Sequence, residues 1–127
     1  MSLQTPLGKA RGLGSAKEGL HHWWMQRVTA VALIPLTLWF AFSVVCIAGA
    51  DYKTVIQEIA SPLNATLIIS LIVASFYHAA LGLQVVFEDY IGSKAVRICC
   101  IVGANLFLFF LAIAGILSVI RIAIGGQ

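Results

Sequence analysis

Three long stretches of this chain contain no lysine, arginine, aspartate or glutamate, and they limit the folds open to it. They cover residues 28–50, 59–87 and 98–120. Each has at least the roughly 20 residues that an apolar α-helix needs to cross about 30 Å of hydrocarbon. The chain is also 61% hydrophobic and only 10% charged, which leaves too little polar surface for a soluble globule. The sequence therefore predicts an all-α membrane protein with three transmembrane helices.

The segments between these stretches set the expected boundaries. We expect a polar N-terminal arm with a helix start over residues 1–27, and transmembrane helices over 28–50, 62–87 and 98–120. Ser61 and Pro62 suit the N-cap and first turn of the second helix, because proline lacks only a donor that would be unpaired there. Pro35 lies inside the first helix and predicts a packing kink. A cleaved signal peptide would have a shorter apolar run than the first stretch.

The positions of lysine and arginine predict an orientation. Lys53 and Arg121 lie on one side, and the other six lie on the side of the N-terminus and second loop: Lys9, Arg11, Lys17, Arg27, Lys94 and Arg97. The positive-inside rule then places the N-terminus inside and the C-terminus outside. The net charge of +3 is largely this topology signal, so we expect no nucleic-acid partner. Without a recognisable targeting extension, a bacterial inner membrane is favoured over a mitochondrial one.

Motifs for nucleotide, flavin or metal-cluster chemistry are not found in the sequence. The three cysteines, Cys46, Cys99 and Cys100, have neither CxxC nor histidine-interleaved spacing, and we interpret them as small apolar residues. Asn105 in the third stretch is interpreted as a hydrogen-bonding contact between helices. The chain alone is therefore expected to perform no substrate oxidation.

His78 is the one histidine within the three stretches, and such an ionisable residue at membrane depth is a candidate functional site. On a helix it shares one face with Gly82, Val85 and Asp89. Gly82 leaves room one turn away, where a flat ligand could approach the backbone. The alternative is a buried histidine that only bonds to a neighbouring helix.

A second polar cluster is expected at the inner membrane edge. The second helix ends there with Glu88, Asp89 and Tyr90, and the first helix starts there, with residues 21–27 including two histidines, two tryptophans and Arg27. Each residue also has a structural interpretation. The tryptophans suit an aromatic belt, Arg27 could reach the headgroups, and the acids could end a helix in water.

Taken together, two segments resemble the signature stretches of the small hydrophobic membrane anchor family of succinate dehydrogenase. They are His-His-Trp-Trp-Met-Gln-Arg-Val-Thr-Ala at 21–30 and His-Ala-Ala-Leu-Gly-Leu-Gln-Val-Val-Phe-Glu-Asp-Tyr at 78–90. The resemblance implies a place in respiratory complex II, which serves the tricarboxylic acid cycle and aerobic electron transport. It also implies three partners, namely a flavoprotein subunit, an iron-sulfur subunit and a second membrane anchor subunit.

The resemblance assigns roles to five residues. His78 matches one axial ligand of haem b, and the other axial ligand is a histidine of the partner anchor. Arg27 and His21 match positions near the haem propionates. The adjacent His22 leaves that last assignment a matter of alignment. Tyr90 matches the tyrosine that donates a hydrogen bond to ubiquinone, and Asp89 matches its acidic neighbour at the edge of the pocket.

Two other classes of protein compete with this interpretation. A small transporter subunit would be expected to carry a carboxylate inside the membrane, whereas all five acids here lie in loops or at span ends. A cofactor-free structural anchor or assembly scaffold of a related complex is the stronger alternative, and the absorption spectrum separates it from a haem-binding anchor.

Overall fold

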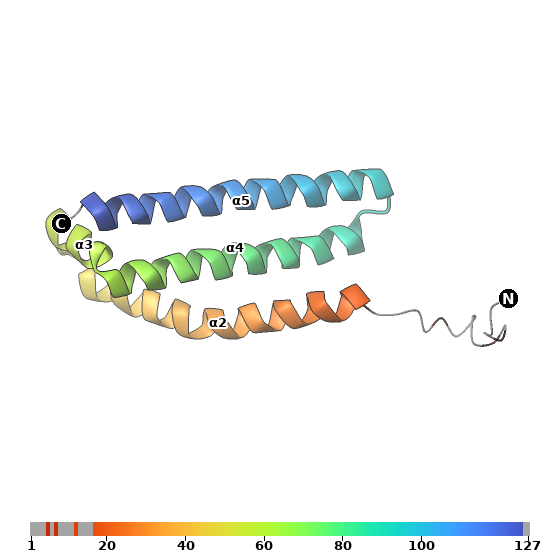
Figure 1. Cartoon of the computed structure of the whole chain (residues 1–127), viewed down its shortest axis with the longest axis horizontal. Coiled ribbons are helices and arrows are strands. Elements are labelled where there is room, and N and C mark those ends of the chain that lie inside the picture. Colours follow the sequence, from red (N-terminus) through yellow and green to blue (C-terminus); the bar gives the residue numbers. More distant parts are fainter. Residues whose placement is uncertain (1–4, 6, 8–11, 13–16, 126–127) are drawn as a thin grey trace.

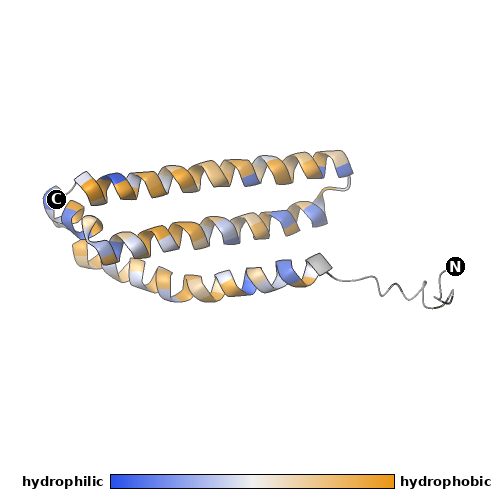
Figure 2. Ribbon diagram, in the orientation of Figure 1, coloured by the Kyte–Doolittle hydropathy of each residue, from blue (hydrophilic) through white to orange (hydrophobic). Residues whose placement is uncertain are grey.

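The computed structural model describes residues 17–125 together with positions 5, 7 and 12. Within residues 17–125 all regular structure is helical, with α2 (Lys17–Ile47), α3 (Tyr52–Ala60), α4 (Pro62–Tyr90) and α5 (Lys94–Gly125). Three of these helices are long and apolar enough to cross a membrane, which confirms the predicted helical membrane architecture. Hydrophobic residues dominate their lengths, and hydrophilic ones gather mainly near the helix ends (Figure 2).

The predicted polar arm over residues 1–27 lies partly outside the described residues. In its described part, α2 is already helical from Lys17, well before the charge-free stretch begins at Val28. Helix α2 also continues through Pro35 without a break. The helix that positions His21 and Arg27 is therefore continuous with the first candidate span.

Helix α4 lies in the middle of a single layer, with α2 along one side and α5 along the other (Figure 1). The long helices alternate in direction, so the N-terminal end of α2 lies at the same end as the α4–α5 connection (Figure 1). The C-terminal end of α4 and the motif at the start of α2 are thereby brought to one end of the molecule.

Little of the chain is buried within the layer. Among the described residues the only buried ones are Ala65, Leu81, Val119 and the polar Thr29. Large apolar side chains face outward along all three long helices; Phe110, for example, is 66% exposed. An outward apolar surface of this extent suits contact with lipid or with another membrane chain rather than with water.

The connection between the first two spans contains a helix that the sequence analysis did not anticipate. Helix α3 is short and amphipathic, and it packs against α4 and α5. At its start, the Thr54 hydroxyl donates to the carboxylate of Asp51, and this hydrogen bond lowers the pKa of Asp51. The predicted cap of the second span is confirmed, because Ser61 accepts from the backbone N–H of Asn64 and Pro62 opens α4.

Helices α4 and α5 approach closely at Gly115. A Cβ atom there would lie 3.2 Å from Cδ1 of Ile72, whereas one at Gly103 would meet nothing within 4 Å. Overpacking a tight contact costs roughly 1–3 kcal/mol. We therefore expect Gly115→Leu to lower the free energy of unfolding of the chain in detergent by about that amount.

Gly103→Leu is the matched control, since it changes the same helix in the same way where space is open. Equal effects of the two substitutions on reversible unfolding would show that the α4–α5 contact at Gly115 is not tight.

Candidate functional site

The imidazole of His78 projects from α4 onto α2 and has a hydrogen-bond partner at each ring nitrogen. Its Nδ1 lies 2.9 Å from Oγ1 of Thr29, and its Nε2 lies 3.2 Å from the amide nitrogen of Gln26. Thr29 is only 7% exposed, so this contact is shielded from the surroundings. His78 thus has a partner within its own chain, and both contacts come from one neighbouring helix.

These contacts are consistent with a ring proton on Nδ1. The Thr29 hydroxyl has one proton and lies 2.8 Å from the carbonyl oxygen of Met25, one turn earlier, to which it donates. In this arrangement it accepts from the Nδ1–H of His78. The amide group of Gln26 is oriented with its nitrogen toward the ring, so its N–H donates to Nε2, which must then be unprotonated. Both contacts are satisfied by the same neutral tautomer.

This tautomer matters because an imidazole binds a metal through an unprotonated nitrogen. Metal-binding histidines commonly donate the opposite N–H to an oxygen, which fixes the ring orientation and raises the basicity of the ligating nitrogen. In this chain Thr29 supplies that oxygen. The arrangement therefore presents Nε2 as the donor atom for a ligand.

A cavity of about 520 Å³ lies at this contact between α2 and α4. Its walls come from both helices: His22, Trp23, Gln26, Arg27, Ala30, His78, Gly82 and Val85. The predicted face of α4 is present here in His78, Gly82 and Val85, while Asp89 is not among the lining residues. Gly82 lies beside Gln26 at this wall, since a Cβ atom there would be 3.7 Å from the Gln26 amide nitrogen, an ordinary van der Waals distance.

The cavity contains polar groups whose hydrogen-bonding capacity is not met. Nε2 of His22 and Oε1 of Gln26 are both buried and have no hydrogen-bond partner. Arg27, in contrast, is exposed, and its guanidinium carbon lies 5.0 Å from the centroid of the Trp23 ring. Buried polar atoms without partners are uncommon in native proteins, so a water molecule, a ligand or another subunit would be expected to bond to them.

The two adjacent histidines differ in their surroundings. His22 is partly buried and lines the cavity, whereas His21 is exposed and is not among the lining residues. The choice between them could not be made from the sequence, because it depends on the rotation of α2 about its axis.

Asp89 and Tyr90 lie at the exposed end of α4, and Tyr90 is 85% exposed. Neither is among the residues that line the cavity at His78. The neighbouring Glu88 accepts a hydrogen bond from the Gln84 amide at 2.9 Å. The structure therefore places the predicted quinone-binding residues at the same end of the molecule as the cavity, with their side chains open to a neighbour.

Two residues at the site were missed by the sequence analysis. Gln26 and Thr29 make the contacts to His78, yet neither was predicted to have a role. The available signal was spacing: Gln26 follows His22 by four residues and Thr29 follows Gln26 by three, and both steps return to the same helix face. Groups of three or more His, Cys, Asp or Glu side chains placed to hold a metal are not found in the described residues.

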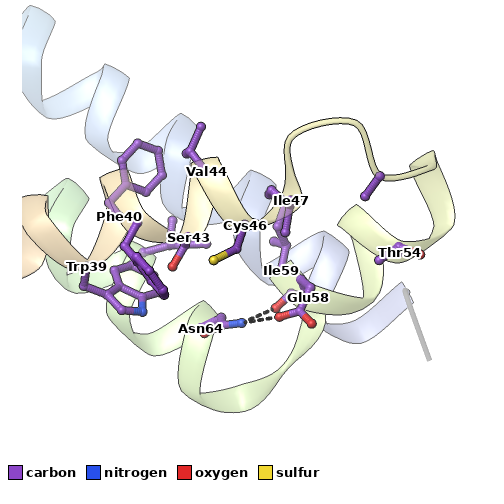
Figure 3. A pocket seen from close by; sticks show the side chains of 13 residues that line it. Trp39, Phe40, Ser43, Val44, Cys46, Ile47, Thr54, Glu58, Ile59 and Asn64 are labelled. Carbon is purple, nitrogen blue, oxygen red and sulfur yellow. Dashed lines mark hydrogen bonds between the residues drawn. The ribbon is translucent and has the colours of Figure 1, made fainter.

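A second cavity, of about 600 Å³, lies at the opposite end of the molecule, where α2 ends and α3 and α4 begin (Figure 3). Aromatic and aliphatic side chains form most of its wall, including Trp39 and Phe40. Its polar end contains Glu58, whose Oε2 accepts a hydrogen bond from the Asn64 amide at 3.0 Å (Figure 3). This cavity contains no histidine and is separate from the contact at His78.

The fold and the site define a multi-pass helical membrane protein with an imidazole held between two spans at the wall of a cavity. Residues 1–120 match the family model described as succinate dehydrogenase/fumarate reductase transmembrane subunit. The chain belongs to this family, as its two sequence motifs predicted, and it is a membrane anchor subunit of succinate dehydrogenase.

Individual relatives agree with the family match. The chain is 38% identical over 111 residues to the succinate dehydrogenase hydrophobic membrane anchor subunit of Rickettsia bellii, which covers 87% of this chain and 89% of the relative. It is 28% identical over 121 residues to the protein of the same description from Paracoccus denitrificans, with 95% and 93% covered. The similarity therefore extends over nearly the whole of each chain.

Proposed function

We propose that this membrane anchor supplies one axial ligand to a haem b through His78 and forms part of the site at which ubiquinone is reduced. The observation that carries the haem assignment is the pair of contacts to His78, which leaves its Nε2 as the unprotonated nitrogen at the wall of the cavity. The cavity beside His78 supports a ligand there rather than a histidine that only bonds to a neighbouring helix.

The residues around the cavity fit the chemistry of this group. His78 would bind the iron, Thr29 would hold the ring in orientation, and Arg27 with His22 would neutralise and bond the propionate carboxylates. The unpartnered Nε2 of His22 supports that role, because a carboxylate would satisfy it. When bound, a haem supplies a one-electron carrier whose potential depends on its axial ligands and their hydrogen bonds.

His22, the other histidine at the cavity, is assigned to the propionates, so a second axial histidine would come from another polypeptide. We infer that the second membrane anchor of the complex supplies it and covers the site. The outward apolar faces of the long helices leave ample surface for such a partner. The flavoprotein and the iron-sulfur protein would bind at the membrane edge and deliver electrons from succinate.

The quinone part of the proposal concerns the end of α4. Quinone reduction takes up two electrons and two protons, so it benefits from a donor at a carbonyl oxygen and from a nearby route to water. The Tyr90 hydroxyl would provide the donor, and Asp89 would assist proton supply at this exposed edge. Asp89 follows His78 by about 16 Å of helix rise at 1.5 Å per residue.

The proposed orientation puts this edge on the inner side of a bacterial cytoplasmic membrane. The N-terminal end of α2 and the α4–α5 connection lie at the same end of the molecule (Figure 1). That end carries Arg27, Lys94 and Arg97, whereas Arg121 is near the other end of α5. The charge difference supports an inside N-terminus.

The absorption spectrum of the purified complex tests the haem proposal. A b-type spectrum that is lost on substitution of His78 supports it, and a wild-type complex without such a spectrum would contradict it.

The two adjacent histidines give a further prediction. Because His22 lines the cavity and His21 does not, we expect His22→Leu to weaken haem retention by roughly 10- to 150-fold, the loss of one charge-assisted hydrogen bond. His21→Leu is the control and should change retention by less than about twofold, roughly the scale of a surface substitution. Retention is measured as haem transfer from the complex to apomyoglobin. A larger effect at His21 would reverse the assignment.

A further inference from the structure

We propose that the side-chain amide of Gln26 is a displaceable cap on Nε2 of His78, closed when no haem is bound and turned aside when iron occupies that nitrogen. The inference rests on the proposed role of His78 as a haem ligand. In this role Gln26 lowers the affinity of the site for haem, because it competes with the iron for Nε2, whereas a residue that contacts bound haem would raise that affinity.

The geometry of the imidazole requires this competition. A neutral imidazole has one in-plane lone pair on its unprotonated nitrogen. The Gln26 amide nitrogen, 3.2 Å away, donates its hydrogen into that lone pair. Iron would need the same lone pair, so the hydrogen bond and the coordinate bond exclude one another. Gln26 must therefore move before His78 can bind a metal.

The cap is useful to a chain that has not yet received its cofactor. An unpaired polar nitrogen between two membrane helices would be unfavourable, and the amide satisfies it without a charge. Gln26 makes this bond while its own Oε1 remains buried without a partner. The closed position is thus only half satisfied, which makes the cap easy to displace.

An alternative partner for Gln26 lies on its own helix. His22 is four residues earlier, so the two side chains project from the same face of α2, and both line the cavity. The buried atoms without partners are Nε2 of His22, which can donate when protonated, and Oε1 of Gln26, which can only accept. A rotation of Gln26 toward His22 would free His78 and pair these two atoms until a propionate carboxylate accepts the hydrogen bond of His22 instead.

The test uses the complete complex carrying Gln26→Met, which keeps an unbranched side chain of similar length but removes the donor. Haem is partitioned at equilibrium between the complex and apomyoglobin. The cap predicts that Gln26→Met shifts the partition toward the complex by roughly 2- to 12-fold, the equivalent of one net hydrogen bond. If Gln26 instead helps to hold haem, the same variant shifts the partition toward apomyoglobin, and the proposal is overturned; an unchanged partition overturns it too.

Thr37→Val is the matched control for substitutions on this helix. The Thr37 hydroxyl bonds to carbonyl oxygens one turn earlier, as that of Thr29 does, but it has no contact with His78. It should leave the partition unchanged. If Gln26→Met does not assemble, Gln26→Leu replaces it, and histidine-selective nitrogen NMR of wild-type and variant haem-free complexes reports the bond directly. A His78 Nε2 resonance that is the same in both would also overturn the cap.

Haem binding by the His78→Ala complex distinguishes failure of the Gln26 cap from failure of the proposed haem ligand. If His78→Ala binds haem as the wild type does, the ligand assignment itself fails. If His78→Ala loses haem while Gln26→Met has no effect, only the cap fails.

Discussion

Replacing His78 with alanine is expected to remove the b-type absorption bands of the purified complex. Substituting a residue that merely orients a ligand weakens metal affinity by roughly 10- to 100-fold, so loss of the ligand itself should exceed the upper value. The two side chains that contact the ring cannot replace it. Thr29 offers a hydroxyl and Gln26 a neutral amide, and neither group is among the usual axial ligands of haem iron.

Asn105→Leu is a suitable control, since it also alters a polar side chain within a span but lines a different cavity, on the α5 side of α4. It should leave the spectrum unchanged. An assembled His78→Ala complex with a wild-type spectrum would show that the iron is bound elsewhere. A wild-type complex with no b-type bands at all would instead favour the cofactor-free anchor or assembly scaffold.

Tyr90→Phe is expected to lower the rate of quinone reduction by roughly 100-fold, the typical effect of removing one hydrogen-bond donor from an oxygen that gains charge in the reaction. Oxidation of succinate with a soluble dye as acceptor should stay close to the wild-type rate, because the flavoprotein and iron-sulfur protein perform it. Tyr90 is 85% exposed in this chain, so removal of its hydroxyl leaves the helix packing intact.

The chain provides a matched control for this substitution in Tyr52, which is 81% exposed at the start of α3, at the other end of the molecule. Tyr52→Phe should affect neither activity. Parallel loss of both activities in Tyr90→Phe would indicate failed assembly, and retention of full quinone reduction would remove Tyr90 from the site.

Most of the fold follows from the sequence because the membrane imposes one rule. A spanning segment must satisfy its own backbone, so a charge-free run of sufficient length predicts a helix regardless of packing. The rule does not predict the connecting helix α3, because this helix is amphipathic and its nine residues are too few to span a membrane. Likewise, the first turns of α2 are polar, and hydropathy gives no sign that the helix begins at Lys17.

The site was only partly predictable, for a different reason. His78 is identified by the unfavourable energy of an ionisable group in the membrane, and its face is set by helix periodicity. Its partners Thr29 and Gln26 depend on how α2 is rotated and shifted against α4, which one chain's sequence does not specify. The choice between His21 and His22 depends on the same rotation of α2, and the structure places His22 at the cavity.

Affinity purification of this chain from its native membrane, with identification of every co-purifying protein and an absorption spectrum of the product, tests the central claim most directly. We predict a flavoprotein, an iron-sulfur protein and one further small membrane anchor in equal amounts, with one b-type haem per complex. Recovery of the chain without the second anchor, or of the intact complex without haem, would contradict the proposal that His78 holds a haem shared between two membrane anchors.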